Sequence, residues 1–258
     1  MRELLTVTQL SKQFGGQPVL RDISLALNQG DVLAVLGRSG CGKTTLLKIL
    51  AGLETPDVGA LALHGQDLRP VPPNARQMVY LYQEPLLFPH LTVFENVAFG
   101  LRIRHVAKAE VDQQVRGLLD ELDLGAHAQK APHQLSGGQR QRVSFGRALI
   151  IRPRVLLLDE PFGNLDAQTR ADMQQLFLRV SRQHQITSLF VTHDSREALT
   201  VGSRFAYLDQ GQLTSYAAVA DFIDDPRTSI RAELAFWDTI QQTAALPDEP
   251  SRLTSITS

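Results

Sequence analysis

A glycine-rich loop at Gly37–Thr45 has the residue types and the spacing needed to bind phosphate groups. It fits the pattern G-x-x-x-x-G-K-[ST], in which the glycines let backbone N–H groups approach phosphate oxygens closely. Lys43 would reach the outer phosphates as a positive charge, and the Thr44 hydroxyl would ligate Mg²⁺. The loop residues that we expect to contact a nucleotide are Gly37, Ser39, Gly40, Cys41, Gly42, Lys43, Thr44 and Thr45.

The segments on both sides of this loop are those that the pattern requires. Asp31–Leu36 is a short apolar run typical of a buried strand, and Leu46–Ala51 is typical of a helix that ends at Gly52. A ligand-free turn between a strand and a helix is the alternative, and the complete spacing with both flanks argues against it. Because Cys41 lies inside the loop, we expect its thiolate to be accessible in the empty site and shielded by bound nucleotide.

Two more strand patterns end in side chains that could act on a phosphate. Val155–Leu158 leads into Asp159 and Glu160, and a strand pattern ending at Thr192 is followed by His193. The carboxyl ends of parallel strands meet at one edge of a sheet, so we expect these side chains near the glycine loop. Asp159 would hold Mg²⁺ through water, and Glu160 would orient or deprotonate an attacking water. The alternatives are caps of a following turn for the two acids and a structural role for the histidine.

A glutamine and a second glycine-rich segment complete the candidate site. Gln83 follows the strand pattern Met78–Tyr82, a place where a glutamine alone indicates little. Leu135–Gln139 places a serine and two glycines at the start of a predicted helix, which would form a second anion-binding terminus. One phosphate loop does not need two such termini, so we expect this one to serve a nucleotide on a second copy of the chain. An ordinary serine cap is the alternative.

In this order and together, the motifs resemble those of the ATP-binding cassette (ABC) family over residues 4–216. The matching segments are Phe14 (adenine-stacking aromatic), Gly37–Thr45 (Walker A), Gln83 (Q-loop), Leu135–Gln139 (signature), Val155–Glu160 (Walker B), Asn164–Asp166 (D-loop) and His193 (switch histidine). From the residues alone, Phe14 beside two glycines could stack on a purine or fill the core at a turn, and the core is favoured.

The resemblance implies that ATP and Mg²⁺ bind to this chain and that ATP is hydrolysed. The residues that it implicates in nucleotide binding beyond the glycine loop are Phe14, Ser136, Gly137, Gly138, Gln139 and Asp166. It implies catalytic roles for Glu160, His193 and Gln83. It implies a magnesium site at Thr44, Gln83 and Asp159.

The resemblance also implies partners. Two copies would close head-to-tail on ATP and drive a separate membrane permease, which Gln83–Leu101 would contact. The residue sequence of this segment is similar to that of bacterial importers for iron, sulfate, polyamines or sugars. We therefore expect the transport to be uptake and a substrate-binding protein to belong to the same system. We expect the chain to lie at the cytoplasmic face of the membrane. The sequence does not identify the transported substrate, and ferric iron ranks first among the candidates on the sequence of this segment alone.

We expect an α/β fold with a P-loop NTPase core, in which the sheet is mostly parallel. An N-terminal antiparallel β-subdomain would precede it, and a helical subdomain would be inserted at about 84–140. The ATPase domain would span 1–219. Residues 220–258 would form a short, partly disordered extension, too small for the regulatory β-domain that many importer subunits carry.

The bulk composition limits the alternatives. The chain has 258 residues, a net charge of −1 and one cysteine, and it contains no apolar run of about 18–20 residues and no secretory apolar core at its start. We therefore expect a chain that is soluble by itself and has no nucleic-acid partner. A soluble ABC ATPase acting on nucleic acid or ribosomes would be revealed by salt-dependent binding to DNA or RNA, and a P-loop kinase by a phosphorylated product. The segment Leu135–Gln139 argues against the kinase.

Overall fold

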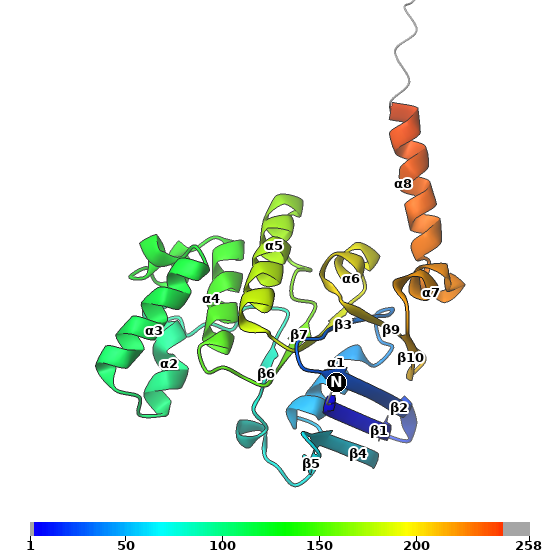
Figure 1. The fold of residues 1–258 in the computed structure, drawn as a ribbon, viewed down its shortest axis with the longest axis horizontal. Coiled ribbons are helices and arrows are strands. Elements are labelled where there is room, and N and C mark those ends of the chain that lie inside the picture. Colours follow the sequence, from blue (N-terminus) through cyan, green and yellow to red (C-terminus); the bar gives the residue numbers. More distant parts are fainter. Residues whose placement is uncertain (1–2, 245–258) are drawn as a thin grey trace, which may run out of the picture.

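The computed structural model describes residues 3–244, whose strands form two sheets with helices around them (Figure 1). The strands are β1 (Glu3–Phe14), β2 (Gln17–Asn28), β3 (Val32–Leu36), β4 (Val58–Leu63), β5 (Gln66–Asp67), β6 (Met78–Leu81), β7 (Val155–Asp159), β8 (Ser188–Thr192), β9 (Arg204–Asp209) and β10 (Gln212–Tyr216). The α-helices are α1 (Lys43–Ala51), α2 (Val93–Ile103), α3 (Lys108–Glu121), α4 (Gly137–Leu149), α5 (Ala167–His184), α6 (Ser195–Val201), α7 (Val219–Asp224) and α8 (Ile230–Ala244). Short 3₁₀ turns are η1 (Pro73–Ala75), η2 (Gly125–His127), η3 (Pro132–Gln134) and η4 (Pro226–Thr228).

The larger sheet has the strand order β10-β9-β3-β8-β7-β6, and its strands are parallel except for β10. Every residue of β3, β7 and β8 is buried, because helices or the second sheet cover both faces. Alternate residues enter different cores: Leu156 and Leu158 pack with α4 and α5, whereas Leu157 packs with α1. The expected α/β fold with a mostly parallel sheet is confirmed.

The N-terminal sheet is antiparallel, with the order β2-β1-β4-β5. Alternating apolar residues predict strands at Leu4–Leu10 and Ile23–Leu27. In the structure both strands are longer and continue to a two-residue turn. In that turn Gly15 and Gly16 have φ values of 56° and 79°, which glycine adopts without strain. The hairpin therefore extends its tip, and with it Phe14, well beyond the predicted strands.

Helices α2, α3 and α4 lie together at one end of the molecule (Figure 1). The sequence Thr92-Val93-Phe94-Glu95 has the form of a capping box at a helix start, and the structure confirms it. Thr92 Oγ1 accepts from the Glu95 backbone N–H at 3.2 Å, and Glu95 Oε2 accepts from the Thr92 N–H at 2.9 Å. In the next segment, Lys108–Leu124, apolar residues spaced four, three and four apart predict one helical face, and all of them are buried, namely Val111, Val115, Leu118 and Leu122. The boundaries of a subdomain at about 84–140 stay a prediction.

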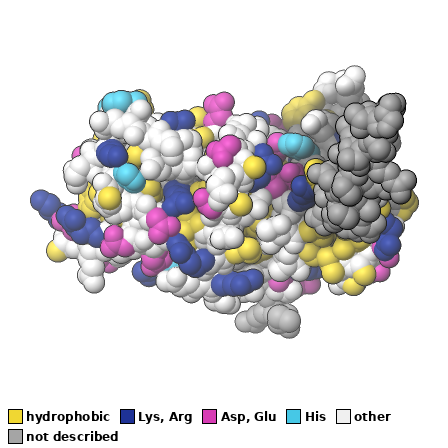
Figure 2. Space-filling model, turned by 90° about the horizontal axis from the view of Figure 1, so that it is seen from above, with side chains coloured by type: hydrophobic (Ala, Val, Ile, Leu, Met, Phe, Trp, Pro, Cys, Tyr) yellow, Lys and Arg dark blue, Asp and Glu magenta, His cyan; other side chains and the backbone are white. Residues whose placement is uncertain are grey.

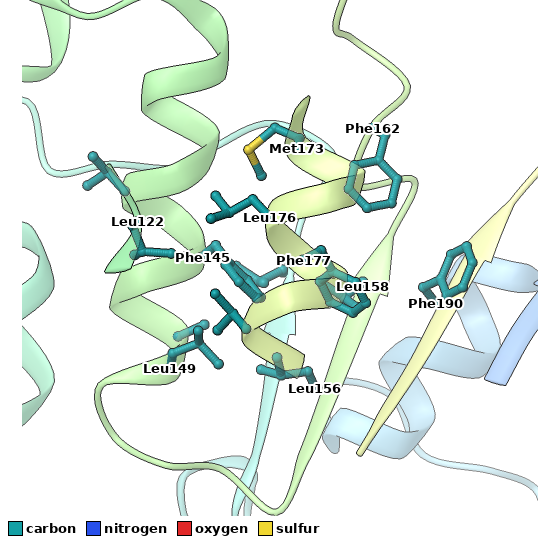
Figure 3. Packing of buried hydrophobic residues seen from close by; sticks show 14 of the residues in the cluster. Leu122, Phe145, Leu149, Leu156, Leu158, Phe162, Met173, Leu176, Phe177 and Phe190 are labelled. Carbon is teal, nitrogen blue, oxygen red and sulfur yellow. The ribbon is translucent and has the colours of Figure 1, made fainter. Parts of the chain in front are cut away.

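Helix α5 joins this helical end to the larger sheet through aromatic packing (Figure 3). The ring centroids of Phe177 and Phe145 are 5.5 Å apart, and those of Phe177 and Phe162 are 6.2 Å apart. Phe162 is fully buried and lies two residues after Glu160, so its packing anchors the loop that follows β7.

Helix α8 extends away from the rest of the molecule (Figure 1). The apolar neighbours Leu234, Ala235 and Phe236 predict a small helix around Trp237, and α8 contains these residues. The Arg196 guanidinium lies 4.0 Å from the centroid of the Trp237 ring. The expected disorder of the Ser/Thr-rich tail falls on 245–258, outside the described residues. Over 3–244, no helix is both long and apolar enough to span a bilayer. On the face in Figure 2, Lys and Arg side chains are interspersed with Asp and Glu.

Candidate nucleotide-binding site

The glycine loop is tied to the carboxyl end of the larger sheet and leads directly into α1. The Gly37 N–H donates to the Thr192 carbonyl oxygen at 3.2 Å. Gly42 precedes α1 with φ 109°, and a Cβ atom there would lie 2.8 Å from Leu20 Cδ2, so a glycine is needed. Helix α1 begins with no side-chain cap and no acidic residue in its first turn. Its first N–H groups can therefore bind an anion.

Lys43 turns back over the loop and is only 6% exposed. Its Nζ donates to the carbonyl oxygens of Gly37 at 2.7 Å and Arg38 at 3.1 Å. The same nitrogen is 3.8 Å from Glu160 Oε1. A buried ammonium group is costly unless it is paired, and here two carbonyls and one carboxylate supply the partners. The arrangement places one positive charge inside the loop, where a phosphate would lie.

Three oxygen-bearing side chains meet beside the start of α1. Thr44 Oγ1 donates to Asp159 Oδ1 at 3.3 Å, and the Tyr80 hydroxyl donates to Asp159 Oδ2 at 2.6 Å. Burial, followed by the hydrogen bond to Asp159, raises the pKa of Tyr80 far above its ordinary value, so this hydroxyl stays a donor. Hard cations such as Mg²⁺ take oxygen ligands, and the Thr44 hydroxyl and Asp159 carboxylate fit that preference.

Glu160 lies between two basic side chains. Its Oε2 is 3.1 Å from His193 Nδ1, and its Oε1 faces Lys43. The Glu160 backbone has φ 44° while its N–H donates to the Val191 carbonyl oxygen at 3.0 Å. This left-handed conformation turns the chain, so that Asp159 points to Thr44 and the next carboxylate points to His193.

Gln83 lies near the same carboxylate. A Cβ atom on Gly163 would be 3.6 Å from Gln83 Nε2 and 3.7 Å from Glu160 Oε2, so the amide and the carboxylate flank one glycine. The Gln83 side chain is exposed. The structure therefore gathers Lys43 and Thr44 with the predicted side chains at the ends of three strands, β6, β7 and β8, namely Gln83, Asp159, Glu160 and His193.

The second glycine-rich segment contacts the start of α5. Ser136 Oγ caps α4 by accepting from the Gln139 N–H at 3.2 Å, and Gln139 Oε1 accepts from the Ser136 N–H at 2.9 Å. Gly138 packs against Thr169 Cγ2, and Gly137 lies beside Leu165. These contacts belong to the start of α5 and the loop before it, whereas the phosphate loop starts α1.

Asp166 caps the neighbouring helix. Its Oδ1 accepts from the Thr169 N–H at 3.1 Å. Hydrogen bonding by the Thr169 side chain, followed by this bond from its N–H, holds the pKa of Asp166 below its usual value. A carboxylate at a helix N-terminus also interacts favourably with the helix dipole. Asp166 thus has a structural role at α5, and its predicted contact with nucleotide stays a prediction.

Two expectations about side-chain exposure are wrong. The residues alone favoured a core position for Phe14, but its ring is 46% exposed at the hairpin tip, with Lys12 Nζ 4.9 Å from the ring centroid. The Cys41 thiol was expected to be accessible, but Cys41 is 9% exposed and belongs to the core beneath the loop. Burial raises the pKa of the Cys41 thiol, so the side chain behaves as a small apolar group.

Sequence reasoning missed Tyr80 and Arg170. Tyr80 falls in the strand pattern Met78–Tyr82, which predicts a buried strand, and its position in β6 places its hydroxyl at Asp159. Arg170 on α5 donates from Nη2 to the Leu165 carbonyl oxygen at 3.0 Å and lies 3.8 Å from the buried Glu197 carboxylate. Even-odd alternation along the strand could have placed Tyr80 on the correct face, whereas no local signal indicated the partners of Arg170.

The mostly parallel sheet and the glycine loop between β3 and α1 define a P-loop NTPase fold. A model of the ABC transporter family matches residues 20–163, and the chain belongs to that family. It is 43% identical over 236 residues to the spermidine/putrescine import ATP-binding protein PotA of Protochlamydia amoebophila, covering 90% of this chain and 62% of that protein. It is 45% identical over 228 residues to the sulfate/thiosulfate import ATP-binding protein CysA of Ralstonia nicotianae, covering 87% of this chain and 61% of that protein.

This chain spans less than two thirds of the length of those two relatives. Among solved structures, cbiO1 from Clostridium perfringens, described as part of the ABC transporter complex cbiONQ, aligns with a TM-score of 0.82. The alignment covers 95% of this chain and 100% of that one at 23% identity, and it shows the shared fold.

Proposed function

We propose that this chain is the ATP-hydrolysing subunit of a bacterial import system. The observation that carries the proposal is the position of Glu160 between Lys43 and His193, beside the Thr44–Asp159 pair. This arrangement brings together a phosphate-binding loop, a set of metal-binding oxygens and a carboxylate that could accept a proton from water. The resemblance of the motifs to those of the ABC family supports the same conclusion.

The phosphates of ATP would bind at the start of α1, where Lys43 supplies positive charge and the loop glycines supply N–H groups. Thr44 and Asp159 would hold Mg²⁺, together with Gln83. Bound Mg²⁺ would neutralise charge that develops on the transferred phosphoryl group. Over 3–244, His, Cys, Asp and Glu side chains form no cluster of three or more suited to a metal.

Glu160 would orient and deprotonate the attacking water, and His193 would hold Glu160 in place and contact the terminal phosphate. The Glu160 backbone is held by its hydrogen bond to Val191, and its carboxylate lies between Lys43 and His193, so the base would need little reorganisation during the reaction. Phe14 at the exposed hairpin tip would stack on the adenine ring.

Two copies would close head-to-tail around ATP. In one chain, the Ser136–Gln139 segment contacts the start of α5 and not the start of α1. Its helix terminus, together with Asp166, would reach the phosphates held by the second copy. A contact of this kind supplied by a partner chain can add about 10³–10⁵-fold in rate.

A groove beside the Gln83–Leu101 segment would bind the permease. It has a volume of about 730 Å³ and includes Leu86 and Ile103, which are 54% and 62% exposed, and the Phe88–Phe99 ring pair. The Arg147 guanidinium lies 5.1 Å from the Phe88 ring centroid. Exposed apolar side chains in a groove are typical of a protein-binding surface, and an amphipathic permease helix would fit it.

The names of the relatives favour a polyamine or sulfate as the transported substrate. The sequence of the Gln83–Leu101 segment alone ranks ferric iron first. We place the chain at the cytoplasmic face of the membrane, bound through its permease, with a substrate-binding protein in the same system.

Hydrolysis is tested with the purified chain, ATP and Mg²⁺, by measuring phosphate release for wild type and Glu160→Gln. We expect release by wild type and its loss in the variant, with ATP retained in a dimer detected by size-exclusion chromatography. Transfer of phosphate to another molecule without release would instead indicate a kinase and contradict the proposal.

The transport role is tested by purifying the tagged chain from its native membranes in mild detergent. A stoichiometric multi-span permease among the co-purifying proteins would support the proposal, and a companion binding protein would narrow the cargo. Recovery with ribosomes or nucleic acid in place of a permease would contradict it.

A further inference from the structure

We propose that Tyr80 is a positioning residue for the magnesium site: its hydroxyl fixes which oxygen of Asp159 faces the metal. This inference rests on the proposed function, because it assigns a role within the same nucleotide site. It is carried by two contacts on opposite oxygens of one carboxylate, from Tyr80 to Oδ2 at 2.6 Å and from Thr44 to Oδ1 at 3.3 Å.

The strand register explains why these residues meet. Tyr80 of β6 pairs with Leu157 of the parallel strand β7, so both side chains lie on the same face of the sheet. Asp159 is two residues further along β7 and therefore points to that face as well. Helix α1 packs over this face through Leu47 and its neighbours, which places Thr44, in the first turn of α1, above the end of β7.

The hydrogen bond from Tyr80 restricts the rotation of the Asp159 carboxylate. With Oδ2 occupied by a donor, Oδ1 is the oxygen that points toward Thr44 and the start of α1. Side chains that hydrogen-bond to a metal-binding carboxylate orient it, and their loss typically weakens metal binding about 10–100-fold. Tyr80 is in the right place for this role because Tyr80 and Asp159 are both held by strands that are paired along their length.

The neighbouring Tyr82 provides a matched control. Its ring lies edge-on against the Tyr80 ring, with centroids 4.5 Å apart, and Tyr82 is exposed. Replacing either tyrosine by phenylalanine keeps the ring and this contact. The two variants lose the same chemical group, but Tyr80→Phe loses the bond to Asp159.

The experiment measures binding of a fluorescent, non-hydrolysable ATP analogue to the full chain by anisotropy, in EDTA and across a Mg²⁺ titration. Mg²⁺ should increase the affinity for the ATP analogue, and for Tyr80→Phe we expect the Mg²⁺ concentration that gives half of this increase to rise about tenfold. Affinity in EDTA should stay within about twofold of wild type, because the phosphate loop is untouched. Tyr82→Phe should match wild type in both conditions. Electron paramagnetic resonance of Mn²⁺ in the nucleotide complex should report the same weakening without any turnover.

An unchanged Mg²⁺ dependence in Tyr80→Phe would overturn the inference, and so would an equal loss of affinity in EDTA and in Mg²⁺, which would indicate general damage to the site. An equal effect of Tyr82→Phe would also overturn it. If wild type bound no nucleotide with or without Mg²⁺, the proposed function would fail, and this inference would fail with it. Normal nucleotide binding without any Mg²⁺ enhancement in wild type would overturn the tyrosine role alone.

Discussion

The Glu160 carboxylate lies 3.1 Å from His193 Nδ1 through one oxygen and 3.8 Å from Lys43 Nζ through the other. Three elements position these side chains: Glu160 directly follows β7, His193 directly follows β8, and Lys43 is the first residue of α1. The packing of Phe162 into the core limits movement of the loop after β7. A carboxylate with both oxygens facing basic groups is held in one orientation, which suits a base that must meet a single water.

We expect Glu160→Gln to reduce ATP hydrolysis about 10²–10⁴-fold, because an amide cannot accept the proton of the attacking water. ATP affinity should change little, since the loop and Lys43 are retained. Rapid-quench phosphate release and equilibrium nucleotide binding measure the two effects. Glu110→Gln on the exposed face of α3 is the control and should hydrolyse like wild type. Undiminished hydrolysis in Glu160→Gln would remove Glu160 from the catalytic role.

The contact between Gly138 and Thr169 predicts a stability effect that can be rescued. A methyl group on Gly138 would overlap Thr169 Cγ2, so we expect Gly138→Ala to cost about 1–3 kcal/mol in the free energy of unfolding. Thr169→Ser deletes that methyl group and should restore most of the loss in the double variant. Urea unfolding of both single variants and the double variant measures the coupling.

Gly117 offers the opposite case on α3. It is exposed in the helix interior, and a Cβ atom there would meet nothing within 4 Å. We expect Gly117→Ala to stabilise the chain by about 0.5–1 kcal/mol, because alanine loses less backbone entropy than glycine. Equal effects of alanine at the two glycines would contradict the packing role of Gly138.

The sheet and much of the candidate site could be predicted because their signals are local. The apolar runs before Leu36 and Asp159 identify buried strands, and the glycine spacing identifies the loop between strand and helix. The register between β6 and β7 joins residues more than seventy positions apart, as the Tyr80–Leu157 pair does. No local pattern encodes such a pairing, so the tyrosine could not be assigned to Asp159 in advance.

Side-chain exposure at turns was harder to predict for a similar reason. An aromatic residue beside two glycines suits a buried corner or an exposed hairpin tip, and the extra length of β1 and β2 decides the outcome for Phe14. Cys41 lies in a loop whose predicted phosphate contacts come from backbone N–H groups, which allows its side chain to point into the core. The place of Cys41 in the loop therefore predicts the position of its backbone but not the direction of its thiol.

The buried position of Cys41 gives a prediction opposite to the initial expectation. We expect the native chain to react with a thiol reagent such as DTNB far more slowly than the chain unfolded in urea, because burial shields the sulfur and raises the pKa of the thiol. Bound nucleotide should change the native rate little. Cys41→Ser measures the background, since the chain has no other cysteine. Rapid native labelling that MgATP abolishes would place the thiol in the nucleotide site.

A buried acid on α6, the helix that follows His193, predicts how stability depends on pH. Thr192 Oγ1 donates to Glu197 Oε2 at 2.7 Å, and Arg170 Nε is 3.8 Å from Glu197 Oε1. Burial is the main cause that raises the pKa of Glu197 above its ordinary value, and the bond from Thr192 opposes this shift. The folded chain therefore holds this proton more tightly than the unfolded chain does.

The stability that Glu197 contributes should be complete below its unfolded pKa and be lost as pH rises through its raised folded pKa. Glu197→Gln keeps an acceptor for Thr192 but does not titrate, so the stability of wild type relative to this variant should fall with rising pH. Thr192→Val removes the donor that favours the charged form and should make this pH-dependent loss larger. Urea unfolding in a pH series across this window measures both effects. If wild type instead gained stability over Glu197→Gln as pH rises, the Arg170 ion pair would outweigh burial.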